Sequence, residues 1–147
     1  MKKLLILSLL LILTSWCNAQ TKDLMKTVRK TIEASNAIYA DLANKNDGSI
    51  LTRYTDDACL FPSNTTPVCG REKLLNFFKN GPKVQVKFTI QNLYGDGKTS
   101  VTEESYYEMT DVEGKKLDDG KVIVIWKNTK EGWKMHRDMF SSNHPAK

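Results

Sequence analysis

The sequence predicts an α+β domain in which a cone-shaped, curved antiparallel sheet wraps around helices from the N-terminal half. Apolar residues recur at helical spacing in the first half, whereas from Lys83 onward they alternate every second residue, as in strands. The last third reads as a hairpin of two strands, 121–128 and 133–140, around a turn at 129–132. Strands in this order pair as a meander, and the twist of such a sheet leaves a pocket between its concave side and the longest helix.

Residues 1–19 are predicted to be a signal peptide and not part of this fold. Two lysines precede an apolar run over 4–13 that is too short to span a bilayer, and small residues at 17–19 precede the expected cleavage before Gln20. A membrane anchor is the alternative, but no stop-transfer pattern follows the run. Residues 20–147 then form one exported bacterial domain, periplasmic or secreted, without a membrane span.

The composition narrows the classes of function. The 22 Lys and Arg against 17 Asp and Glu give a formal net charge of +5, which loss of the two lysines in the signal peptide lowers by two, to +3. The basic residues are scattered, without the runs and interleaved aromatic residues that track a nucleic acid. No phosphate-binding loop, dinucleotide fingerprint or nucleophile elbow is present, and neither His136 nor His144 has a cysteine nearby to complete a zinc site. We therefore expect no cofactor, metal or nucleic-acid partner.

The mature chain retains two cysteines, Cys59 and Cys69, on either side of the turn-like segment 62–67. In an oxidising compartment they are predicted to form a disulfide across a short hairpin. Two buried free thiols are the alternative.

Three helices and a small hairpin are predicted before the main sheet. The first helix runs from Thr21 to about Ala43, and its apolar stripe indicates that it lies across the sheet. After it we expect a short helix from Asp47 to Asp57 with Tyr54 on its apolar side, a hairpin of 58–61 and 66–69, and a third helix over 71–80.

The main sheet is predicted to begin with strand 83–91, which has one apolar and one polar face. The next strand, 99–110, carries Glu103 and Tyr107 on one face. In strand 121–128 apolar residues occupy both faces, which predicts a central strand with neither face open to solvent.

The last strand, 133–140, has two faces under strict alternation: Trp133, Met135 and Met139 on one side, and His136, Asp138 and Phe140 on the other. The first side is more apolar, which would bring Arg137 and not Asp138 into the cone. Phe140 lies on the side of His136 and Asp138, so that side can also face the cone. The assignment of the site residues depends on which of the two sides does.

Five short motifs, in this order, resemble the nuclear transport factor 2-like superfamily: 54–58, 68–72, Glu103 with Tyr107, 120–126 and 132–138. The resemblance covers about 24–143 and is closest to the SnoaL-like and ketosteroid-isomerase-like branch of small, uncharacterised bacterial proteins. It implies a cystatin-like α+β barrel, frequent homodimers, and a pocket that some members use for isomerisation, cyclisation, dehydration or epoxide hydrolysis and others only for binding. Such a fold constrains function loosely.

This resemblance carries no catalytic residues over to the chain. The steroid isomerases use a pocket tyrosine and two acidic groups, and these residues cannot be aligned with positions of this sequence. The polar positions that match are those of the uncharacterised branch, for which the family offers no reaction: Tyr54, Glu103, Tyr107, Trp126 and Asp138.

The candidate catalytic residues are Asp138, His136 and Glu103. His136 and Asp138 project from the same face of a regular strand, so the carboxylate can orient the imidazole as a general base, or the two can form an ion pair on the sheet surface. Glu103 would be a carboxylate on an otherwise apolar wall that moves a proton. Its alternative is a salt bridge to Lys121 or Arg137.

The candidate pocket residues are Tyr39, Tyr54, Tyr107, Trp126 and Arg137. Tyr39 and Tyr54 come from the helices expected to cover the mouth of the cone, where either hydroxyl can donate to a ligand oxygen. Packing in the core is the alternative for both, and for Trp126 as well.

Three functions are consistent with these residues. The first is an exported domain, homodimeric through its sheet, that binds a small apolar or aromatic molecule in the cone. The second is a cofactor-free isomerase, cyclase or dehydratase with Asp138 or Glu103 as base, His136 as its partner and a tyrosine hydroxyl as donor. The third is a scaffold with a filled cone that acts through protein contacts.

Overall fold

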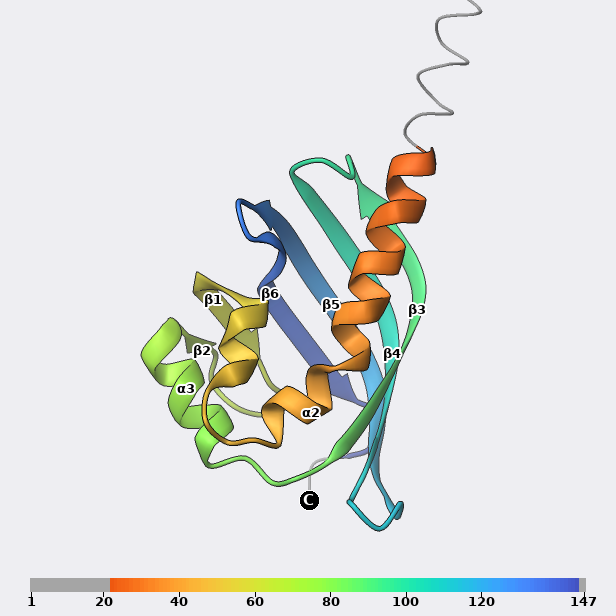
Figure 1. Ribbon diagram of the computed structural model, residues 1–147. Coiled ribbons are helices and arrows are strands. Elements are labelled where there is room, and N and C mark those ends of the chain that lie inside the picture. The colour runs from red at the N-terminus through yellow and green to blue at the C-terminus, as the bar shows by residue number, and fades with distance from the viewer. Residues whose placement is uncertain (1–21, 146–147) are drawn as a thin grey trace, which may run out of the picture.

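The structure is a computed structural model that describes residues 22–145, so the predicted signal peptide lies outside the described residues. Helices gather against one side of a single twisted sheet (Figure 1). The elements in chain order are a long helix over 22–37, α2 (Tyr39–Ala43), the 3-10 helix η1 (Ser49–Arg53), β1 (Tyr54–Phe61), β2 (Val68–Cys69), α3 (Arg71–Lys79), β3 (Gln85–Gly95), β4 (Ser100–Thr110), β5 (Lys116–Thr129) and β6 (Gly132–Ser142).

The sheet has six strands in the order β2-β1-β6-β5-β4-β3. Strands β3 to β6 pair antiparallel with their sequence neighbours, which confirms the predicted meander. The N-terminal hairpin joins the same sheet, because β1 pairs parallel with β6. The curved sheet does not close, and the predicted α+β class is confirmed.

The first predicted helix is interrupted. The described part of the long helix ends at residue 37, Ile38 adopts φ −102° and ψ 2°, and α2 continues in a new direction (Figure 1). Val28, Ile32 and Ser35 of the predicted stripe are buried against the sheet. The break turns Tyr39 toward β3, where its ring meets Phe88 edge to face at 5.4 Å.

The short second helix is wrong in its extent. It is a 3-10 turn whose N-cap is Gly48, at φ 86°, while Asp47 accepts a hydrogen bond from the backbone N–H of Ser49. Tyr54, Asp56 and Asp57 belong to β1 instead. β-Sheet pairing with β6 at Tyr54 therefore prevails over the local helical pattern.

The two faces of β5 differ strongly. Val122, Val124 and Trp126 are buried beneath the helices, but Ile123 is 43% exposed and Ile125 is 38% exposed on the outer side of the sheet. The prediction that neither face is open to solvent is therefore wrong for the single chain, because no element among residues 22–145 covers the outer face.

A β-bulge interrupts β6. Trp126 of β5 pairs with Met135 and Ile125 with Arg137, so His136 has no partner in the ladder. An extra residue reverses the alternation of the residues that follow it.

The bulge brings both Met135 and Asp138 to the concave, buried side, three positions apart, and sends Met139 to the exposed outer side. Strict alternation is therefore wrong for this strand. Asp138, and not Arg137, faces the cavity described below.

Cys59 and Cys69 form a disulfide between β1 and β2, as predicted. Within residues 22–145, no helix has the length and apolar character needed to cross a membrane.

Candidate functional site

A cavity of about 460 Å³ lies between the concave side of the sheet, α2 and α3. Most of its wall is aliphatic or aromatic. The lining residues that matter below are Tyr39, Phe78, Phe88, Tyr107, Asp138 and Phe140.

Asp138 is the acidic residue of this wall and is 6% exposed. Its Oδ2 accepts a hydrogen bond of 2.6 Å from the hydroxyl of Tyr54. Burial raises the pKa of Asp138 to about 6; the bond from Tyr54 lowers it, and the charge of Glu103 raises it. The group thus changes protonation near neutral pH, a property that suits a general acid or base.

Tyr39 and Tyr54 extend from Asp138 as a chain of hydroxyls. The two tyrosine oxygens lie 3.3 Å apart, and because the proton of Tyr54 is directed at Asp138, Tyr39 donates to Tyr54. Burial, followed by the charge of Asp138, raises the pKa of both phenols, so both stay protonated. The chain leads from the buried carboxyl to a residue that lines the cavity.

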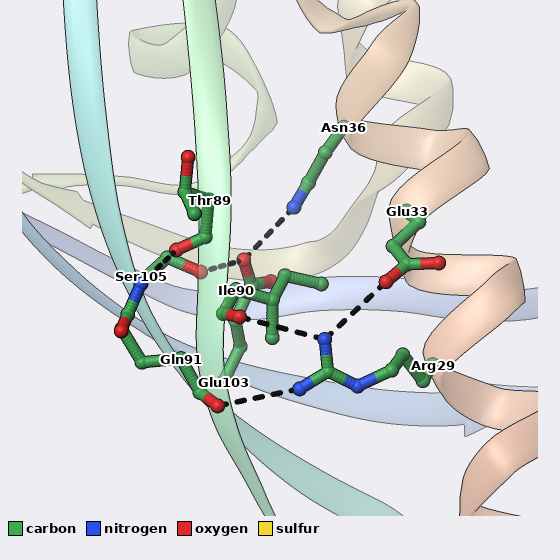
Figure 2. Close-up of polar contacts among 8 residues, drawn as sticks. All are labelled: Arg29, Glu33, Asn36, Thr89, Ile90, Gln91, Glu103 and Ser105. Carbon is green, nitrogen blue, oxygen red and sulfur yellow. Dashed lines mark hydrogen bonds and ion pairs between the residues drawn. The ribbon is translucent and has the colours of Figure 1, made fainter.

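Glu103 is 1% exposed and does not line the cavity. It accepts hydrogen bonds from Asn36 Nδ2 and Trp126 Nε1, both at 2.8 Å, and from the hydroxyl of Ser105. Figure 2 shows Asn36 reaching Glu103 from the long helix. The alternative of a salt bridge to Lys121 or Arg137 is wrong, because neutral donors surround this carboxylate.

His136 does not contact Asp138, so the predicted pair is not formed. At the bulge, its Nδ1 lies 3.1 Å from the hydroxyl of Thr55 and 3.2 Å from Asp57 Oδ1, both on β1. Burial lowers the pKa of His136, and so does the charge of Arg137.

The other predicted pocket residues divide into two groups. The ring of Tyr107 lines the cavity, but its hydroxyl donates to Asp118 at 2.6 Å. Trp126 is fully buried beside Glu103, and Arg137 donates to the backbone oxygens of Asp57 and His136, so neither lines the cavity.

Sequence reasoning missed two contributors to the site. Asp118 precedes the predicted strand 121–128 but belongs to β5, which begins at Lys116. Phe78 lies within the predicted third helix, and only the packing of α3 against the open end of the cone makes it a cavity residue. The helical pattern predicts which residues of a helix are buried, but not which element they pack against.

No family model and no curated protein matches the sequence. Solved structures do match in fold. A nuclear transport factor 2-like protein from Salmonella enterica serovar Typhimurium has 17% identity and a TM-score of 0.67, over 84% of this chain and 94% of its own. A ketosteroid isomerase-like protein from Erwinia carotovora has 19% identity and a TM-score of 0.62, over 78% and 95%. A protein of unknown function with a cystatin-like fold from Nostoc punctiforme has 16% identity and a TM-score of 0.68, over 76% and 88%.

The fold and the cavity define a class: small α+β domains that enclose a pocket between a curved sheet and N-terminal helices. Within that class the chain has the nuclear transport factor 2-like, or cystatin-like, fold. The predicted resemblance is thus confirmed at the level of fold, and the assignment to the SnoaL-like branch stays a prediction.

Proposed function

We propose that residues 20–147 are an exported domain that binds a small, uncharged, apolar or aromatic molecule in the cavity, with Asp138 as its polar anchor. The observation that carries the proposal is a mostly apolar cavity with one buried carboxyl in its wall. Tyr54 occupies Oδ2, and no described residue donates to Oδ1, which leaves that oxygen for a ligand. Apolar pockets with a few placed polar groups are typical small-molecule sites.

The lining supports an uncharged ligand. No Lys, Arg or His is among the described lining residues, so an anion would find no counter-charge. The hydroxyls of Tyr39 and Tyr107 are already engaged by Tyr54 and Asp118. A ligand with one polar group at Asp138 and a ring or aliphatic body against the phenylalanines satisfies the site.

Export rests on the predicted signal peptide, and the Cys59–Cys69 disulfide is compatible with an oxidising compartment. Native mass spectrometry of the protein purified from its own host, compared with the mass after denaturation, tests export and binding together. The denatured protein is expected to have the mass of a chain that begins at Gln20. The native protein is expected to be heavier by the mass of a retained small molecule.

A dye measurement tests the cavity directly. The uncharged fluorophore N-phenyl-1-naphthylamine is expected to bind the wild type, and Met109→Trp, which fills the cavity, to weaken binding at least about tenfold. Ile123→Trp is the matched control, because Ile123 lies on the outer side of the sheet. Equal binding by all three proteins would contradict the proposal.

A second candidate function is acid–base catalysis of the isomerase, cyclase or dehydratase kind. It is favoured by the pKa of Asp138, about 6, and by the hydroxyl chain that ends at Tyr39 on the cavity wall. Asp138 would take the proton, and the hydroxyl of Tyr39 would turn from Tyr54 to donate to a ligand oxygen. Glu103 and His136 do not line the cavity, so neither is a catalytic residue in this second candidate function. Asp138→Asn should abolish turnover and leave the fold intact.

The outer side of the sheet is the expected homodimer interface. Ile123, Ile125 and Met139 are exposed there, and Tyr106 lies beside them on β4. Lys121 and Lys127 of β5, and Glu104 and Glu108 of β4, share this outer side with the apolar patch. The open cavity argues against the alternative of a scaffold with a filled cone.

A further inference from the structure

Glu103 and Asp138 lie in one row of the sheet. Glu103 of β4 pairs with Val124 of β5, which in turn pairs with Asp138 of β6. All three side chains are buried, so they share the concave face. Two strand spacings, about 10 Å, therefore separate the two carboxyl-bearing residues, with a valine between them.

The hydrogen bonds of Glu103 are those of an ionised carboxylate. Three donors converge on its two oxygens, from Asn36, Ser105 and Trp126, and an ionised carboxylate can only accept. Neutral donors stabilise the charge without cancelling it.

No counter-charge neutralises Glu103 within the described chain. The cation drawn in Figure 2, Arg29, is engaged by Glu33 at 3.3 Å and by the backbone oxygens of Ile90 and Gln91. Among residues 22–145, no Lys, Arg or His forms an ion pair with Glu103. Its field therefore reaches its neighbours through a poorly polarisable core.

Few other ionisable groups face Asp138. β1 presents Tyr54, α2 presents Tyr39, and β4 presents Tyr107 and Glu103, whereas β5 and α3 present apolar residues. On β6 itself, His136 and Arg137 contact β1 instead. The phenols stay neutral, which leaves Glu103 as the charge that acts on Asp138.

We propose that Glu103 is a positioning residue of the cavity: its uncompensated buried charge acts across Val124 and holds the proton on Asp138. The charge thereby sets the pH range in which the cavity offers a ligand a hydrogen-bond donor and the range in which it offers an acceptor. The consequence for the ligand rests on the proposed function of the cavity, but the electrostatic coupling does not.

A titration of side-chain carboxyl carbons by ¹³C NMR tests the coupling without any ligand, with Asp138→Asn assigning the signal. Glu103→Gln is expected to lower the midpoint of Asp138 by about one pH unit. The matched control is Glu104→Gln, a neighbouring glutamate on the outer side of the same strand, which should leave the midpoint unchanged. Glu103→Asp retains the charge and should retain the wild-type midpoint; a fall equal to that of Glu103→Gln would assign the effect to packing and overturn the proposal.

The wild type provides a second test that does not depend on the folding of a variant. The Glu103 carboxyl carbon should keep its carboxylate shift while Asp138 titrates. Uptake of a proton by Glu103 over that same range would overturn the proposal. Failure of the dye to bind would instead count against the proposed function and leave the titration result standing.

Discussion

The hydroxyl of Tyr54 donates a 2.6 Å hydrogen bond to Asp138 across the parallel pair of β1 and β6. This bond is the one described contact that favours the ionised form of Asp138 over the protonated form.

Replacement of Tyr54 by Phe is therefore expected to raise the pKa of Asp138 above about 6. Loss of a hydrogen bond to a buried carboxylate should also lower the free energy of unfolding at neutral pH by about 1–3 kcal/mol. NMR titration and urea unfolding measure the two effects. Tyr94→Phe is the control, because Tyr94 is exposed and bonds Glu104. An unchanged pKa in Tyr54→Phe would contradict the role given to this bond.

The stability of the protein should depend on the ionisation of Asp138. Its pKa is raised in the folded state from 3.8 to about 6, so the folded chain holds this proton more tightly than the unfolded chain. The stability that this group contributes is present below about pH 4 and is lost as the pH rises through about 6. Relative to Asp138→Asn, the wild type should lose about 2.5 kcal/mol of unfolding free energy between pH 4 and 7. Urea unfolding at several pH values measures the free energies of unfolding of the two proteins. A difference between them that does not change with pH would exclude a raised pKa of Asp138.

The Cys59–Cys69 disulfide predicts that residues 20–147, unfolded and unreduced, contain no free thiol. Thiol titration of that protein tests the link, and two reactive thiols would disprove it. Replacement of both cysteines by Ala should lower the free energy of unfolding by about 2–3 kcal/mol, since the bond closes a short loop in the unfolded chain.

If the outer side of the sheet is the dimer interface, a single charge introduced there should dissociate the dimer. Ile123→Glu places a carboxylate in the centre of the apolar patch and should shift a dimer to monomer in sedimentation velocity, with the fold retained. Lys98→Glu, an exposed change in the turn before β4, is the control. A wild type that sediments as a monomer at high concentration would exclude this interface.

His136 should be dispensable for ligand binding. Its Nδ1 contacts Thr55, Asp57 and Arg137, which lie outside the cavity, so His136→Gln is expected to leave the affinity for N-phenyl-1-naphthylamine unchanged. The same change should cost about 1 kcal/mol of stability through the lost hydrogen bonds. Loss of dye binding in a folded His136→Gln protein would show that His136 contributes to the binding site.

Much of the fold could be predicted from local patterns. The alternation of apolar residues in β3 and β5 identifies strands, and consecutive strands most often pair. The pairing of β1 with β6 could not be predicted, because nothing in the sequence of β1 identifies a partner some 80 residues away.

The site was harder to predict than the fold for the same reason. One unpaired residue, His136, decides that Asp138 faces inward, and a bulge has no signature in the alternation that it interrupts. The donors of Glu103 come from the long helix and from β5, so its environment is a tertiary property. Its burial on an apolar wall was predicted, but its hydrogen-bond partners were not.

The parallel pairing of β1 with β6 also has a kinetic consequence. Tyr54 and Asp138 are 84 residues apart in the chain, and contacts of such long sequence separation are costly to form because a long loop must close first. The meander can assemble from local hairpins before β1 docks. The hydrogen bond between Tyr54 and Asp138 is therefore expected to form late, and the acid of the cavity should acquire its unusual proton affinity only as folding is completed.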